Sequence, residues 1–279
     1  KFPKINLISS FKKFLDLRLS GVIISVDTKN HYTIAKDCLK NGFNIFIEKP
    51  STNNSKKLQK LNKIAKSKKL LIMSGYIYFY NDYIKYIKKI IRKNFLGKIF
   101  YISCERLNLG PVRSDISSAW DLSSHDIAIC NYIFDDNLSI LNTGGYDFLK
   151  KGVNDISFIS AKIKDIKIDL KASWLNPEKI RKMIILGKKR MLLFDELDFK
   201  NPIKIYNKYA KYPKIKNFKK GFFTQKANIF LGSTLKPKIK SESPLKNEMK
   251  EFINCINYKK KPISLIKSIN ILKTLEKLN

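Results

Sequence analysis

An alternation of short apolar runs with helical patterns across residues 21–73 constrains the fold of this chain more than any other feature. The run Gly21–Val26 is apolar and β-branched, which is typical of a buried parallel strand. The expected strands are 21–26, 43–47 and 70–73, and the expected helices are 31–41, ended by Gly42, and 55–66. Strands that alternate with helices indicate a parallel sheet flanked by helices.

The pattern changes after residue 98, where longer strands follow one another with few helical patterns between them. The expected strands are 99–104, 156–159, 166–174, 182–186 and 191–194, and further helices are expected at 81–94, 244–258 and 265–278. Gly187–Arg190 has the composition of a hairpin turn, whereas residues 201–240 are the least organised part. We therefore expect an α/β chain with a large, mostly antiparallel open sheet in its second half, and domains at 1–95 and 96–279.

Two polar segments follow the first two expected strands of the parallel sheet. They are Ser25–Thr28 and Glu48–Pro50. In such sheets, ligands bind beyond the carboxyl ends of the strands. The sequence therefore predicts that both segments lie along one functional edge.

The formal charge of +33 would ordinarily indicate a nucleic-acid partner. Only six of the 56 basic residues are Arg, however, and the Lys residues are scattered over every segment. A specific nucleic-acid reader usually clusters its charge and uses Arg for bidentate contacts. We therefore expect no specific nucleic-acid partner, and keep a basic nucleic-acid-binding module as an alternative function.

The four cysteines lie far apart in the sequence and form no C-x-x-C pair, so we expect buried free thiols and neither a metal site nor a disulfide framework. No apolar run approaches the ~20 residues that span a bilayer. No signal peptide is evident, and we expect a cytoplasmic protein without a membrane partner. Residue 1 is not Met, which suggests that the sequence is a fragment.

One of the two histidines, His125, stands four residues after Asp121. If the segment is helical, this spacing places the carboxylate and the imidazole on one face. Such a pair can transfer protons near neutral pH. The alternative is an Asp at a helix start and a His whose ring is bound by a backbone carbonyl.

Three stretches together resemble the glucose-fructose oxidoreductase, inositol dehydrogenase and MocA (Gfo/Idh/MocA) family. They are Ile45–Pro50, the segment from Glu105 through Arg113 to Asp126, and Ser173–Arg181. The resemblance implies a Rossmann domain followed by an α/β domain with a large open sheet. It also implies hydride exchange between NAD or NADP and a sugar hydroxyl or ketone. The second stretch is most similar to members that act on nucleotide sugars in surface-polysaccharide synthesis.

The resemblance also implies roles for individual residues. Lys49 would lie against the reacting hydroxyl and the nicotinamide, where an ammonium favours negative charge on oxygen. His125 would be the acid/base, and Asp121 would orient it or bind the sugar. The implied cofactor-binding residues are Asp27, Thr28, His31, Glu48, Lys49 and Trp120, and the implied substrate-binding residues are Arg106, Asn108 and Arg113.

Several of these residues have a second interpretation. A structural capping role for His31 is as plausible as cofactor contact, and Trp120 suits the core as well as a nicotinamide pocket. Arg106, Asn108 and Arg113 either hold an anionic group of the substrate or lie on the surface. Trp174 and Arg181 are assigned to the sheet, and to a subunit interface of a homo-oligomer.

The sequence departs from the family in two ways. The eleven glycines contain no G-x-G-x-x-G turn, whose amides would hold the cofactor pyrophosphate. We therefore expect an N-terminally truncated Rossmann domain, and an inactive or truncated remnant is an alternative function. Asp27 stands where the family commonly has Pro, and its carboxylate would repel a pyrophosphate unless it turns away.

Overall fold

The computed structural model describes residues 5–211 and 227–278, and the chain divides into two compact units. Unit 1 comprises the described part of Lys1–Ile77 together with Ser243–Glu276. Unit 2 comprises the described part of Tyr78–Glu242 and of Lys277–Asn279. This division differs from the boundary expected after residue 95, because α4 (Asp82–Arg92) packs within unit 2 and the last two helices return to unit 1.

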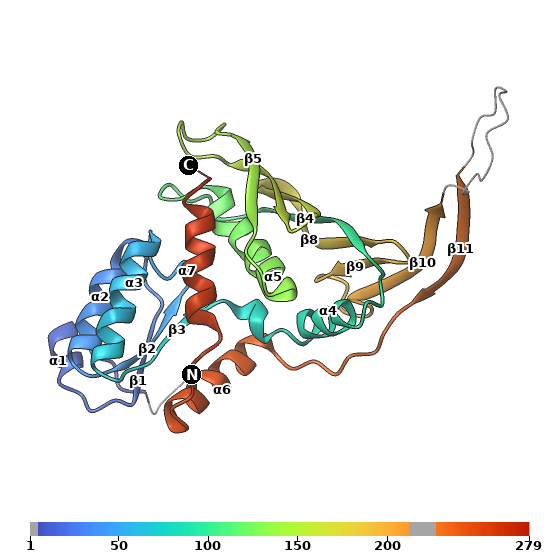
Figure 1. Ribbon diagram of the computed structural model, residues 1–279. Coiled ribbons are helices and arrows are strands. Elements are labelled where there is room, and N and C mark those ends of the chain that lie inside the picture. Colours follow the sequence, from blue (N-terminus) through green and yellow to red (C-terminus); the bar gives the residue numbers. More distant parts are fainter. Residues whose placement is uncertain (1–4, 212–226, 279) are drawn as a thin grey trace, which may run out of the picture. The chain divides into compact units, whose positions relative to one another are not determined.

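Unit 1 is built on a three-stranded parallel sheet in the order β1-β2-β3. Its elements are α1 (Phe11–Leu15), β1 (Gly21–Ile24), α2 (Thr28–Lys40), β2 (Asn44–Glu48), α3 (Ser55–Ser67), β3 (Ile72–Gly75), α6 (Pro244–Asn257) and α7 (Ser264–Leu275). Helices α2 and α3 lie side by side along the sheet, and α7 runs beside β3 and α3 (Figure 1). The alternation of strands and helices in residues 21–75 is thus the predicted one.

Helix ends in unit 1 follow local chemistry. Gly42 follows the end of α2 and has a φ of +87°, a left-handed conformation that glycine adopts without strain. Asn54 caps α3 by accepting a hydrogen bond from the Lys57 amide at 2.9 Å. The Glu276 carboxylate also accepts bonds from the Ser55 amide and hydroxyl at 2.5 and 2.9 Å, which joins the end of α7 to the start of α3.

The core of unit 1 is centred on β2, where Ile45, Phe46 and Ile47 are fully buried. Phe252 of α6 packs edge-on against Phe46 with ring centroids 5.8 Å apart. A Cβ at Gly21 would lie 2.8 Å from Cδ1 of Ile256 and 3.1 Å from the ring of Phe252, so the side chains of α6 pack closely on β1. Helix α6 therefore covers the Phe46 side of the sheet.

Unit 2 is built on an eight-stranded sheet in the order β11-β10-β9-β8-β4-β7-β6-β5. The strands are β4 (Ile99–Leu109), β5 (Ser139–Tyr146), β6 (Ile156–Ile163), β7 (Ile166–Ser173), β8 (Leu175–Gly187), β9 (Met191–Asp195), β10 (Ile203–Lys211) and β11 (Asn228–Leu235). Only β4 and β7 pair in parallel, and every other neighbouring pair of these described strands is antiparallel. The mostly antiparallel sheet predicted for the second half is confirmed.

One face of this sheet is covered by α4 and by α5 (Ser124–Phe134), as Figure 1 shows. Tyr83 of α4 packs on Phe194 of β9, and Asp126 of α5 binds Arg106 of β4. Two short helices, η1 (Ile77–Tyr80) and the π-helix η2 (Ala119–Ser123), precede α4 and α5. The opposite face bears an open groove of about 510 Å³, bordered by Glu105, Asp169 and Lys171.

Several sequence predictions need correction. Residues 201–240, expected to be the least organised part, include the strands β10 and β11, although 212–226 lie outside the described residues. Residues 203–206 of β10 pair with β9, and the buried Ile203 and Ile205 alternate with the less buried Lys204 and Tyr206. Strand β5 was not predicted, since it is rich in Gly and polar residues and lies at the sheet edge. In the part of the chain that the structure describes, no helix combines the length and the apolarity needed to cross a bilayer.

Candidate active site

The carboxyl edge of the unit 1 sheet is tied together by His31. Its Nδ1 lies 3.0 Å from the Pro50 carbonyl oxygen, and its Nε2 lies 2.8 Å from the Val26 carbonyl oxygen. The side chain is buried at 1% exposure. A neutral imidazole has one N–H, so only the doubly protonated ring donates to both carbonyls at once. His31 thus has the structural role that the sequence left open, and it joins the segments after β1 and β2.

Asp27 and Thr28 form the start of α2 on the same edge. Asp27 is the N-cap residue, and its exposed side chain makes no capping hydrogen bond. Thr28 is buried at 6% exposure. A carboxylate at this position faces the positive end of the helix dipole, where an anionic ligand group otherwise binds.

Glu48, Lys49 and Pro50 end β2 on this edge, and the Lys49–Pro50 peptide bond is cis. The half-buried Glu48 accepts a hydrogen bond from the Lys49 amide at 3.2 Å. A Cβ at Gly75 of β3 would lie 3.0 Å from Glu48 Oε2, so glycine leaves the space that this carboxylate occupies. The structure therefore brings Asp27, Thr28, Glu48 and Lys49 to one edge, as predicted from the strand ends, and His31 lies against the segments after both strands.

A second acidic residue, which the sequence did not indicate, lies beside this strand end. Glu248 of α6 is 1% exposed, and its Oε1 receives no hydrogen bond from the described residues. Burial, followed by the negative charge of Glu48, raises the pKa of Glu248 to about 8. The carboxyl of Glu248 is therefore protonated at neutral pH.

In unit 2, Asp121 and His125 lie where η2 runs into α5. The helical spacing was predicted, but the π-helical turn was not; such turns occur frequently at functional sites. Trp174 is 1% exposed, and its indole N–H donates to Asp121 Oδ2 at 3.2 Å. The half-buried His125 ring packs edge-on against Tyr78 with centroids 5.2 Å apart. Protein side chains therefore hold both members of the predicted pair.

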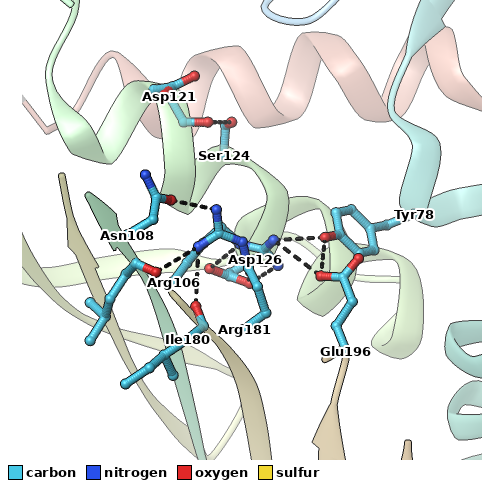
Figure 2. A network of polar contacts seen from close by, with 10 residues as sticks. Tyr78, Arg106, Asn108, Asp121, Ser124, Asp126, Ile180, Arg181 and Glu196 are labelled. Carbon is cyan, nitrogen blue, oxygen red and sulfur yellow. Dashed lines mark hydrogen bonds and ion pairs between the residues drawn. The ribbon is translucent and has the colours of Figure 1, made fainter. Parts of the chain in front are cut away.

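Arg106 of β4 is buried at 5% exposure and binds the carboxylate of Asp126, the residue after His125. Its Nη2 lies 2.8 Å from Asp126 Oδ1, and its Nη1 donates to the Tyr78 hydroxyl at 2.7 Å. Burial alone lowers the pKa of Arg106, but the charges of Asp126, Tyr78 and Glu196 outweigh it and raise that pKa well above its ordinary value. Figure 2 shows this guanidinium enclosed by protein groups.

The other two predicted substrate residues lie further along the same chain segment. Asn108 is the first of them, and its Oδ1 accepts a hydrogen bond from Arg181 of β8 at 2.5 Å. Arg181 also donates to the Leu107 carbonyl at 3.1 Å. Burial, followed by the positive charge of Arg106, lowers the pKa of Arg181. Arg113 lies beyond β4 and pairs with Asp115 at 2.7 Å, where both side chains are partly exposed. Of the predicted substrate residues, Arg113 is thus the one with an accessible guanidinium.

The remaining predicted residue, Trp120, is 6% exposed within η2. The sequence assigned Trp174 to the sheet and an interface, and it missed Tyr78 altogether. The contacts of Trp174 with Asp121 and of Tyr78 with His125 have no local sequence signal, because Trp174 and Tyr78 stand far from the pair in the sequence. Among the described residues, no group of three or more His, Cys, Asp or Glu side chains is placed to hold a metal ion.

The fold defines the structural class: a Rossmann-like α/β unit and an α/β unit built on a large, mostly antiparallel sheet. Residues 2–76 match the model of the Gfo/Idh/MocA family, described as an oxidoreductase family with an NAD-binding Rossmann fold. The predicted resemblance to this family is confirmed, and with it the predicted cofactor class, NAD or NADP. No curated protein sequence matches the chain.

Solved structures with the same fold cover nearly the whole chain. A UDP-N-acetylglucosamine 3-dehydrogenase, GnnA from Acidithiobacillus ferrooxidans, is 19% identical, with a TM-score of 0.76 over 98% of this chain and 81% of that one. An aldose-aldose oxidoreductase from Caulobacter crescentus is 12% identical, with a TM-score of 0.77 over 96% and 78%. The 3-ketoreductase KijD10 from Actinomadura kijaniata, in complex with TDP-benzene and NADP, is 12% identical, with a TM-score of 0.76 over 95% and 79%.

Proposed function

We propose that this chain is an NAD(P)-dependent oxidoreductase that exchanges hydride between nicotinamide and a sugar hydroxyl or ketone of a nucleotide sugar. The observation that carries the proposal is the Asp121–His125 pair at the junction of η2 and α5, with Asp121 bound by Trp174. The UDP-N-acetylglucosamine 3-dehydrogenase activity of GnnA, and the TDP-benzene bound to the 3-ketoreductase KijD10, support the substrate class. A place in surface-polysaccharide synthesis and in the cytoplasm belongs to the same proposal and rests on the family resemblance.

The described residues fit one end of a nicotinamide dinucleotide. The edge of unit 1 offers Thr28, Glu48 and the ammonium of Lys49 beyond two strands that His31 ties together. The 279 residues contain no G-x-G-x-x-G turn, and Asp27 places a carboxylate at the start of α2. The proposal therefore assigns these groups to the nicotinamide end of the cofactor.

When bound, the nicotinamide supplies the hydride chemistry. His125 accepts the proton of the sugar hydroxyl during oxidation and returns it during reduction. Asp121, whose Oδ2 receives the Trp174 N–H, orients the imidazole or binds the sugar. Lys49 contributes a positive charge that favours the alkoxide form of the reacting oxygen. Arg113 and Asn108 are proposed to contact the anionic part of the substrate.

The test is an absorbance assay of NAD⁺ and NADP⁺ reduction with UDP-N-acetylglucosamine and with UDP-sugar uronates. We expect saturable turnover that falls by about 10²- to 10⁴-fold in His125→Ala and Lys49→Ala. Lys56→Ala, which removes an exposed lysine from α3, is the matched control and should keep full activity. Turnover that survives His125→Ala would contradict the assigned acid/base.

A second candidate is a noncatalytic protein with the same fold, because Asp27 places a carboxylate at the start of α2, where it would repel an anionic cofactor group. Isothermal titration calorimetry separates the two. An enzyme binds NAD⁺ or NADP⁺ saturably, and Lys49→Ala weakens that binding more than Lys56→Ala does. A noncatalytic chain shows no saturable heat with either dinucleotide.

We also propose that the protein self-associates through the uncovered face of the unit 2 sheet, because an exposed sheet face with mixed charges suits a second copy. Glu105, Asp169 and Lys171 border the groove on this face. Sedimentation velocity should show a homo-oligomer in the wild type. Lys171→Glu should shift the distribution towards monomer, and a monomeric wild type would refute the proposal.

A further inference from the structure

We propose that Tyr78 is a positioning residue that fixes the imidazole of His125, and that the buried Arg106 holds Tyr78 in place. The inference rests on the proposed function, since it assigns His125 its acid/base role. It gives Arg106 a role in the interior of unit 2 in place of the predicted substrate contact. All the residues involved belong to unit 2.

The Tyr78 hydroxyl has a defined direction of hydrogen bonding. Arg106 Nη1 donates to it at 2.7 Å, and the hydroxyl donates to Glu196 Oε2 at 2.7 Å (Figure 2). Because a guanidinium only donates and a carboxylate only accepts, the order of donation from Arg106 through Tyr78 to Glu196 is fixed. Burial raises the pKa of the Tyr78 hydroxyl, which keeps it a donor at neutral pH. The phenol is thus held at its polar end by two charged groups.

The same guanidinium holds the helix that carries His125. Its Nε lies 3.2 Å from both carboxylate oxygens of Asp126, and its Nη2 lies 2.8 Å from Oδ1. Asp126 is 3% exposed and follows His125 directly at the start of α5. One side chain on β4 therefore fixes both the backbone beneath His125 and the ring beside it.

The aromatic contact transmits this restraint to the imidazole. The Tyr78 and His125 rings meet at an interplanar angle of 68°, while the Arg106 guanidinium carbon lies 4.9 Å from the Tyr78 ring centroid. The second side-chain torsion of histidine is intrinsically broad, so a neighbouring ring restricts it effectively. A ring held edge-on by Tyr78 presents its nitrogens in a constant direction.

Arg106 itself is poorly suited to a substrate. Its side chain is 6% exposed, and its donors point to Asp126 and Tyr78, with Glu196 Oε2 3.6 Å from Nη1. An anionic substrate group would have to displace a buried carboxylate to reach it. The accessible positive charge on this part of the chain belongs to Arg113.

The test compares Tyr78→Leu, which removes the ring, with Tyr78→Phe, which keeps the ring and removes its hydroxyl. The control is Tyr83→Leu, which removes a half-buried ring packed on Phe194 in the same unit. We expect Tyr78→Leu to lower kcat by about 10- to 100-fold with KM nearly unchanged, because a misaligned acid/base group acts mainly on the chemical step. Tyr78→Phe should lie between Tyr78→Leu and the wild type, and Tyr83→Leu should match the wild type.

A second readout needs no turnover. The chain has two histidines, so ring-labelled histidine gives one NMR signal set from His125 and another from His31, which lies in the other unit. Tyr78→Leu should shift and broaden the His125 signals and leave those of His31 in place. Folded Tyr78→Leu with unchanged kcat and unchanged His125 signals would overturn the inference.

The two proposals fail separately. If the wild type lacks turnover, the proposed function fails, whereas the NMR comparison still decides whether Tyr78 positions His125. If Tyr78→Leu does not fold, Glu196→Ala takes its place. This variant removes the carboxylate that accepts the hydrogen bond of the Tyr78 hydroxyl, and it does so at a partly exposed position. Disturbed His125 signals in folded Glu196→Ala and Tyr78→Phe support the positioning role, and wild-type signals in both refute it.

Discussion

The buried carboxyl of Glu248 should make the stability of unit 1 fall as the pH rises. Below about pH 4.5 the carboxyl is protonated in both the folded and the unfolded chain. Its folded-state pKa is raised from 4.5 to about 8, by burial and then by the charge of Glu48. Between these two values, the unfolded chain loses the proton and the folded chain keeps it. The free energy of unfolding therefore decreases across this window and levels off above it.

The magnitude follows from the width of the window. At pH 7 the carboxyl of the unfolded chain is ionised, because the pH lies well above its ordinary pKa of 4.5. Each pH unit above that pKa lowers the free energy of unfolding by about 1.36 kcal/mol, so the folded state is less stable at pH 7 than at pH 4 by about 3 kcal/mol. Glu248→Gln keeps the size of the side chain and cannot ionise. The variant should therefore lack this dependence, and at pH 7 it should be more stable than the wild type by about 3 kcal/mol.

The assay is urea denaturation followed by far-UV circular dichroism from pH 5 to pH 9, combined with hydrogen exchange of the β2 amides as a probe of unit 1. Glu251→Gln, a change at a half-buried position on the same helix, is the control and should follow the wild type. Identical pH slopes for the wild type and Glu248→Gln would refute the reasoning.

Three further predictions concern the hydrogen bonds of the site. His31→Ala should lower the free energy of unfolding by about 1–3 kcal/mol in urea denaturation, because it removes the ring nitrogens that lie against the Val26 and Pro50 carbonyl oxygens; a loss below about 0.5 kcal/mol would contradict the role of His31. Arg106→Met should cost about 3–5 kcal/mol by the same measurement, because it strands the Asp126 carboxylate. The double variant Arg106→Met with Asp126→Leu should recover much of that loss, and equal losses in the single and double variants would argue against the ion pair. Trp174→Phe should lower kcat more than it raises KM, since it removes the N–H that binds Asp121, and steady-state kinetics would refute this if only KM changed.

The part of the fold that depends on local pattern was predictable from the sequence. Each strand of unit 1 overlaps one of the predicted apolar runs, and Gly42 follows the end of α2. Strand β5 carries mostly exposed residues and no alternation, because an edge strand buries few side chains. Residues 139–146 form a strand by pairing with β6, and their own sequence carries no strand pattern.

The candidate site divides in the same way. The positions of Glu48 and Lys49 follow from the rule on strand ends, and the helical spacing of Asp121 and His125 follows from the apolar pattern after them. Their partners Trp174 and Tyr78 are brought to them only by the fold of unit 2. A buried Glu such as Glu248 carries no local signal, because its burial depends on α6 packing against β2.

The composition of unit 1 from two distant segments has a consequence for synthesis of the protein. The ribosome produces β1, β2 and β3 first, yet the surface of Phe46 and Gly21 is covered by residues of α6, which emerge after Glu242. Domains generally fold in the order of their synthesis. Unit 1 is therefore completed only after the strands of unit 2 have been made, so nascent chains that stop before Ser243 leave the Phe46 side of its sheet without α6.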